Sequence, residues 1–371
     1  MTDLTRSSEL HFGSDLGLQS GVKISPDLTL KQTQHKLCQG AQKAQLRSRA
    51  QLLRGRYKLL FLSIIALAAI IIYLSWGLYG RETSQIEFAL RLRIPKLIVM
   101  VLTSFAIGGA SLVFQSVIRN TIVTPCLLGM NSLYTLIHTA VYFIAGSGSF
   151  LARNANLSFA VDVLLMGFIA TLIYSFLFKK TGNNVLYVLL VGTILTSFFS
   201  SLQTSMTRLM DPNEYDSLLN TLVASFTKSN TQIIFFSFIL LSLIILFSLP
   251  ELRLLDVISL GKDVAINLGV PFDRCLRKLL LGVVLCIAVA TALVGPISFL
   301  GLILANLARQ YIQGYRHSHL IPASALFGMI GIVGGQLLVE HCFHYVIPIS
   351  VFITVGGGIY FLYLILTRKS I

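Results

Sequence analysis

The sequence predicts an all-α protein that crosses a membrane with about ten helices, and three observations support this class. Charged residues make up only 12% of the chain and hydrophobic residues 55%, whereas soluble domains carry about 25% charged residues. The mean hydropathy is +0.79. Runs such as Ser63–Ile72 are apolar on every face, whereas strands of a membrane barrel alternate polar and apolar residues. The composition therefore excludes a soluble domain and favours a polytopic helical bundle.

The N-terminal segment, residues 1–56, is polar and rich in Ser, Gln, Lys and Arg. It has no apolar core of a secretory signal peptide, and its composition is typical of disordered chain. We therefore expect a cytoplasmic extension over residues 1–56, followed by a transmembrane domain over residues 57–371.

The rest of the chain contains apolar runs of about the length that a membrane helix requires. The predicted spans are Leu59–Tyr79, Leu97–Val117, Leu127–Gly146, Phe159–Phe178, Val185–Met206, Thr231–Leu249, Leu279–Val294, Ser298–Ile312, Ile321–Val339 and Ile347–Leu366. In the second span, Gly108, Gly109 and Ser111 predict a close helix–helix contact. Two breaks, Gly295-Pro296 and Gly356–Gly358, indicate either the border of a cavity or tight packing. For the triple glycine we expect tight packing.

The net charge of +14 would suggest a nucleic-acid partner if the protein were soluble. In a membrane protein, Lys and Arg gather instead in the cytoplasmic loops. Lys179, Lys180, Arg309, Arg316 and Arg368 all fall at span ends that this rule places inside the cell. The distribution of charge therefore predicts that both termini are cytoplasmic.

The chain lacks the residues that would let it power transport alone. Asp162, near an outer end, is the only acidic residue within the predicted spans, whereas ion-coupled carriers bury charged groups along their ion pathways. No GxxxxGK[ST] phosphate loop is present, so the chain does not bind ATP in the usual way. A secondary carrier is therefore the disfavoured alternative, and a partner must supply the energy.

A membrane enzyme that acts on a lipid-linked substrate is a further alternative. His138, His341 and His344 are its candidate side chains, but no Ser/His/Asp arrangement or HExxH motif accompanies them. A lone histidine in a span, such as His138, is more often a hydrogen-bonded structural residue. The five cysteines show no metal-ligand spacing. We therefore expect no catalytic residue and no metal site.

The fifth span carries a stripe of neutral polar side chains. Steps of three and four residues place them on one helix face: Thr193, Thr196, Ser200, Gln203, Thr204 and Thr207. Such a stripe either lines a path that passes a large solute without gripping it, or forms hydrogen bonds between helices.

The longest charged segment between two apolar runs is the loop over residues 252–278. Its middle, Ile258–Leu268, predicts a short helix with Leu260, Val264, Ala265 and Leu268 on one face. Gly269 and Pro271 are suitable helix stops. The apolar face, flanked by basic residues, predicts either a docking site for a soluble partner or an amphipathic helix on the bilayer surface.

Five blocks of this sequence together resemble one known family. They are RIPK (93–96), the run Gly108–Gly129 ending in RNTIVTPCLLG, SLGKDVAINLGV (259–270), GPISFLGLILANLAR (295–309) and IPISVFITVGGGIYF (347–361). In this order and at this spacing they resemble the iron-siderophore and vitamin B12 permease family of ABC importers (FecCD-like). The resemblance covers about residues 59–366, which is nearly all of the chain beyond its N-terminal segment.

The resemblance implies the architecture of a type II ABC importer permease, with ten helices per subunit and two permease subunits around one pore. It also implies two ATPase subunits that bind ATP and Mg²⁺, an extracytoplasmic substrate-binding protein, and the bacterial cytoplasmic membrane as the location. No cofactor is implied for this chain itself.

The resemblance also implies roles for individual residues. The loop is similar to the coupling helices that enter a cleft of the ATPase, and the positions that match this motif are Ser259, Leu260, Gly261, Ala265, Leu268 and Gly269. Arg93 and Lys96 match paired basic positions that meet acidic residues of the binding protein. In this interpretation the polar stripe of the fifth span lines part of the translocation path.

Two short stretches depart from the family pattern. Ala305-Asn306 stands where Pro-His is common, and Arg119–Val123 stands where RNPLA is usual. Together with MDPNEY (210–215), these variants resemble the branch that imports ferric catecholate and related siderophores through a pore of two different permeases. We therefore expect a ferric siderophore as substrate and a heterodimeric pore, with haem or cobalamin as the alternative substrates.

Overall fold

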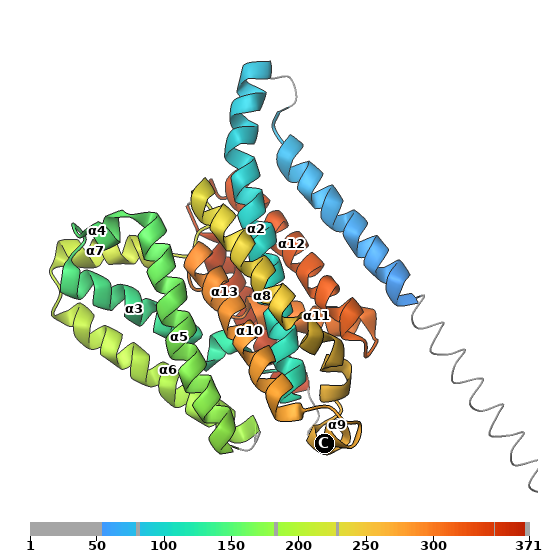
Figure 1. Cartoon of the computed structure of the whole chain (residues 1–371). Helices are drawn as coiled ribbons and strands as arrows, with labels where there is room; N and C mark the ends of the chain where they lie inside the picture. The colour runs from blue at the N-terminus through green and yellow to red at the C-terminus, as the bar shows by residue number, and fades with distance from the viewer. Residues whose placement is uncertain (1–53, 79–81, 182–184, 228–229, 345, 368–371) are drawn as a thin grey trace, which may run out of the picture. The chain divides into compact units, whose positions relative to one another are not determined.

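Figure 1 shows the computed structural model of the chain, in which the described residues are 54–78, 82–181, 185–227, 230–344 and 346–367. These residues contain helices and no strand, as predicted. The predicted extension over residues 1–56 lies outside the described residues, except for residues 54–56, which already belong to the first helix.

A long helix stands at each of the predicted spans. These helices are Arg54–Ser75, α2 (Thr83–Ile118), α3 (Met130–Ala145), α5 (Ala155–Thr181), α6 (Val185–Arg208), α8 (Thr231–Ile258), α10 (Phe272–Val294), α11 (Leu300–Ile312), α12 (His317–His341) and α13 (Ile349–Thr367). Within the described residues, 7 helices are long and apolar enough to cross a membrane. By contrast, α3 and α11 have only 16 and 13 residues, fewer than the roughly 20 of a straight span.

Four short elements connect the long helices. They are η1 (Pro125–Leu128), α4 (Phe150–Arg153), α7 (Pro212–Leu222) and α9 (Lys262–Asn267). The start of α7 is encoded locally, because the Asp211 side chain accepts a hydrogen bond from the Asn213 backbone N–H at 2.9 Å and Pro212 occupies the first helical position.

Helix α2 is the centre of the bundle and packs against α8, α10, α11 and α12 (Figure 1). It is 36 residues long, or about 54 Å at 1.5 Å per residue, and therefore extends well beyond the predicted span. Small residues bring its neighbours close, as predicted. A side chain on Gly108 would meet the Ser324 carbonyl oxygen of α12 at 3.0 Å, and Gly301 of α11 packs directly on Ser111.

Of the two predicted breaks, only Gly295-Pro296 interrupts the helices, because α13 continues without a break through Gly356–Gly358. After α10 ends, residues 295–299 are not helical, and Phe299 has a φ of +62°. Gly357 of α13 is buried against this Phe299 side chain, whereas the space beside Gly356 and Gly358 is open. Tight packing is therefore the correct interpretation for Gly357 alone.

Candidate functional site

The loop between α8 and α10 is shorter than the predicted 252–278. Helix α8 continues through Pro250 to Ile258, and α10 begins at Phe272, so that only residues 259–271 connect them. The physical reason is burial, because Leu255, Ile258 and Phe272 are all core residues that extend the helices toward the loop.

The predicted helix over Ile258–Leu268 is wrong at its start, because α9 begins only at Lys262. Gly261 is the N-cap residue of α9 and has a φ of +118°. Ala265 was predicted to lie on the same face as Leu260, Val264 and Leu268, but it is 0% exposed and packs toward α8 and α10 instead. An alanine fits this position because α9 lies close to both helices.

The outward face of the loop is apolar. Leu260 is 56% exposed and Leu268 62%, and Val264 and Ile266 are exposed beside them. Ile266 was missed by the sequence analysis, because it lies outside the i, i+4 stripe. Large apolar side chains that project together from one short segment mark a surface that another molecule covers.

The turn after α2 packs against the loop 259–271. Arg119 ends α2 in the left-handed conformation, with a φ of +58°, and its guanidinium lies against Gly261. A Cβ on Gly261 would come within 2.9 Å of Arg119 Nη1. Glycine is therefore required here both by its backbone angle and by the space that Arg119 occupies.

An ion pair joins α8 and α10, the two helices on either side of the loop. Lys278 of α10 donates to Glu251 of α8 at 2.8 Å, and the Glu251 side chain is almost fully buried. Lys278 was predicted to lie in the loop but belongs to α10, and Glu251, just before the predicted loop, belongs to α8. The pair fixes the spacing of α8 and α10 just above residues 259–271.

The predicted polar stripe lies on α6, where its hydroxyl groups are satisfied within the helix. Thr193, Thr196 and Thr204 each donate to a backbone carbonyl three or four residues earlier, at 2.8 Å. Thr207 does so at 3.0 Å. Among contacts between described residues, only Ser200 of this stripe reaches another helix, where it lies 3.3 Å from Ser132 of α3. The stripe, including half-buried Gln203, therefore offers a polar face without a strong interhelical network.

Arg93 and Lys96 are both engaged inside the chain. Arg93 Nη1 donates to the backbone carbonyls of Tyr73, Leu74 and Trp76, at 3.1, 3.1 and 2.8 Å. It thereby satisfies the last carbonyls of the helix Arg54–Ser75. Lys96 Nζ lies 3.7 Å from Glu340 Oε1 of α12. The sequence analysis did not foresee either contact, because the partners are distant in the chain.

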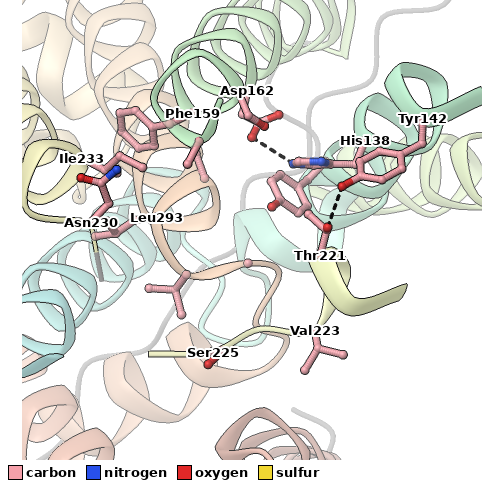
Figure 2. A pocket seen from close by; sticks show the side chains of 16 residues that line it. His138, Tyr142, Phe159, Asp162, Thr221, Val223, Ser225, Asn230, Ile233 and Leu293 are labelled. Atoms are coloured by element: carbon pink, nitrogen blue, oxygen red, sulfur yellow. Dashed lines mark hydrogen bonds and ion pairs between the residues drawn. The ribbon is translucent and has the colours of Figure 1, made fainter. Parts of the chain in front are cut away.

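A pocket of about 450 Å³ lies between α3, α5, the end of α7 and the ends of α8 and α10. Figure 2 shows His138 pointing toward Asp162, with Nε2 and Oδ2 2.9 Å apart, and Tyr142 paired with Thr221. His138 and Asp162 are both buried. His138 is therefore hydrogen-bonded within the span, as expected, and the described residues contain no cluster of three metal-ligating side chains.

A sequence model of the FecCD transport family matches residues 58–367. The chain belongs to the FecCD transport family. The resemblance inferred from the five sequence blocks is thereby confirmed. As a FecCD protein the chain is a permease subunit of an ABC transporter and a multi-pass membrane protein.

Individual relatives support this assignment. The FecCD chain is 38% identical over 318 residues to the petrobactin import system permease protein YclO of Bacillus subtilis (strain 168), covering 86% of this chain and 99% of the relative. It is 31% identical over 281 residues to the petrobactin import system permease protein FatC of Bacillus anthracis, covering 75% and 79%.

A solved structure confirms the fold. The inward-facing structure of an ABC transporter described as metal-chelate type matches with a TM-score of 0.71 at 24% identity, covering 85% of this chain and 100% of the other.

The two departures of this FecCD chain from the family pattern contact each other. Asn306 Nδ2 donates to the backbone carbonyl of Thr121 at 3.0 Å and to that of Leu302 at 2.9 Å. Thr121 lies two residues after Arg119, which supports Gly261. The variant pair therefore forms one unit that holds the turn beneath the loop.

Proposed function

We propose that this chain is the translocating subunit of an ABC importer that carries a ferric siderophore across the bacterial cytoplasmic membrane. The observation that carries this proposal is the exposed apolar face of residues 260–268, in a chain of the FecCD family. The end of the bundle that bears α9 then faces the cytoplasm, as do both termini.

The loop 259–271 acts as the contact through which a separate ATPase moves the permease. Leu260, Val264 and Leu268 present the apolar surface that enters a cleft of the ATPase. Gly261 and Gly269, with φ values of +118° and +80°, form the turns on either side of α9. Ser259 Oγ donates to the Asp256 carbonyl at 2.8 Å and ends α8, and buried Ala265 anchors α9. ATP and Mg²⁺ are bound by the ATPase.

A second permease subunit completes the pore, and we propose that it is a different chain. The polar face of α6 then lines part of the path between the two subunits. A path of neutral hydroxyl groups passes a chelate without trapping it between the inward and outward states. At the opposite end, a substrate-binding protein docks near Arg93 and Lys96, where an acidic side chain competes with Glu340 for Lys96.

The proposed substrate class follows from the relatives. The names of two relatives refer to petrobactin, another to iron(3+)-hydroxamate and a fourth to ferric enterobactin. These three ligands are siderophores, which favours a ferric siderophore over haem or cobalamin for this chain. Catecholate siderophores are the first to test.

The test is uptake of a radiolabelled ferric siderophore by vesicles that contain this chain, its partner permease, the ATPase and the binding protein. Uptake requires ATP. A Leu260→Glu, Gly261→Asp variant inserts normally but transports about tenfold less or worse, because charged side chains do not enter an apolar cleft. Normal transport by this variant overturns the coupling role. Uptake that persists without ATP and stops when the proton gradient is removed indicates a secondary carrier instead.

A further inference from the structure

Four helices meet in a partly buried polar cluster next to the loop 259–271. Its members are Asp256 at the end of α8, His317 at the start of α12, Ser116 near the end of α2 and Arg309 in α11. Asp256 lies three residues before Ser259, where the loop begins. The sequence analysis gave no role to Asp256, His317 or Ser116.

Asp256 joins α8 directly to α12. Its Oδ1 accepts the His317 backbone N–H at 2.9 Å and lies 2.5 Å from His317 Nδ1. His317 is the first residue of α12, and the residue before it, Arg316, makes no side-chain capping bond. The first N–H groups of a helix have no partner within the helix, so the carboxylate of α8 serves as the N-terminal cap of α12.

The other face of the histidine continues the connection. His317 Nε2 lies 2.8 Å from Ser116 Oγ, and Arg309 Nη2 donates to the same oxygen at 2.8 Å. His317 and Ser116 are buried, whereas the Asp256 side chain is 39% exposed beside the loop. The cluster therefore runs from the accessible base of the loop into the interior of the bundle.

These bonds matter mechanically because α8 and α12 share few other contacts. Each packs far more extensively against other helices, α12 on α2 and α8 on α10. A displacement of the last turn of α8 reaches α12 either through Asp256 and His317 or only indirectly through other helices. A charge-assisted cap is short and directional, and it transmits a shift that an apolar contact would absorb by sliding.

We propose that Asp256, His317, Ser116 and Arg309 form a coupling relay that carries movement of the ATPase-bound loop to α12, α2 and α11. This inference rests on the function proposed above and assigns positioning roles to the four residues. When the ATPase pulls α9, the last turn of α8 moves, α12 follows through its cap, and the inner ends of α2 and α11 follow through Ser116 and Arg309.

The test compares ATP hydrolysis with siderophore uptake in vesicles that contain the whole transporter. In an Asp256→Ala variant the number of chelates transported per ATP falls about tenfold, while binding-protein-stimulated ATP hydrolysis is kept. Asp256→Asn retains an oxygen at the capping position and restores at least about half of the ratio. Asp216→Ala, which removes an exposed carboxylate from α7, is the matched control and leaves the ratio unchanged.

A double variant separates a relay from independent packing effects. In a relay, Asp256→Ala combined with Ser116→Ala lowers the ratio no further than Asp256→Ala alone, because one break disconnects the path. Losses that multiply overturn the relay, as does an unchanged transport ratio in Asp256→Ala.

Failure of the relay and failure of the proposed function give different results. If the wild-type transporter takes up no chelate in response to ATP, the proposed function fails. If the wild type is coupled and the variants keep its ratio, only the relay fails. If Asp256→Ala does not assemble, a second variant, His317→Gln, tests the relay instead. It is purified together with its partner subunits by size exclusion. It too is expected to keep ATP hydrolysis and lose transport, and an unchanged ratio in this variant overturns the relay.

Discussion

At the scale of single residues, the base of the loop is defined by contacts between side chains far apart in the sequence. Gly261 leaves room for the guanidinium of Arg119, and Asn306 holds the carbonyl of Thr121. Each residue is small or polar at a position where a bulkier apolar side chain would separate the helices. The turn 119–124 and the loop 259–271 therefore act as one unit.

Gly261 tests this unit directly. Its φ of +118° and ψ of 168° lie in a region that essentially only glycine occupies, and a side chain there also displaces Arg119. We expect Gly261→Ala to cost about 1–3 kcal/mol of folding stability and to weaken binding of the ATPase measurably in a pull-down with the detergent-solubilised permease.

Gly269→Ala is the matched comparison. Gly269 has a φ of +80° and open space around it, so its cost should be about 1 kcal/mol. Equal effects of the two substitutions would contradict the role of Arg119.

The pair of His138 and Asp162 makes a second residue-scale prediction. A carboxylate that loses its partner while buried costs about 3–5 kcal/mol, so His138→Ala should lower the thermal stability strongly. Removing both groups in His138→Ala, Asp162→Ala should cost less than removing His138 alone. His344→Ala, at an exposed position, is the control. If the single and double variants are equally unstable, the carboxylate is not the source of the loss.

At the scale of elements, the first helix is held to the bundle through polar contacts at both ends, and at its start Lys58 donates to the Tyr311 carbonyl of α11 at 2.6 Å. Arg93 satisfies its last carbonyls, and Glu340 accepts from Tyr73 at 3.2 Å and lies near Lys96. Only 17% of the most apolar part of this helix is buried within the chain, so apolar packing alone holds it weakly. The two basic residues therefore have a structural role, whatever they contribute to docking.

A charge exchange distinguishes structure from docking. Lys96→Glu places two carboxylates together and should lower the thermal stability, and Lys96→Glu combined with Glu340→Lys should restore it. If Lys96 also meets an acidic residue of the binding protein, the exchanged pair should still bind that protein about three- to tenfold more weakly at low salt. Full recovery of both properties would limit Lys96 to its structural role. The binding protein's affinity is measured by surface plasmon resonance at two salt concentrations.

At the scale of the whole molecule, the sequence predicted the all-helical fold and the order of the helices, because a membrane helix pairs its backbone polar groups internally and needs about 20 apolar residues to span the bilayer. It could not predict where α8 and α10 end, since Leu255, Ile258 and Phe272 look like loop residues until their packing partners are known. It also missed the bond from Asp256 to His317, 61 positions apart, because only the fold brings such residues together. The motif glycines, by contrast, were identifiable, since a turn limits its residue types locally.

The surfaces of α6 and α13 predict how this chain completes a pore. Only 11% of the most apolar part of α13 is buried within the chain, and Tyr187, Ile194 and Phe198 are exposed on α6. We expect one of these faces to be covered by a second permease that is a different chain.

The measurement is co-expression of two differently tagged copies of this chain, with and without the neighbouring permease. With a heterodimeric pore, purification through one tag recovers the partner permease but not the other tagged copy. Recovery of both tagged copies in a complex with the ATPase would mean that two copies of this chain form the pore. In that case, the chelate path would have twofold symmetry, with two identical α6 stripes facing each other.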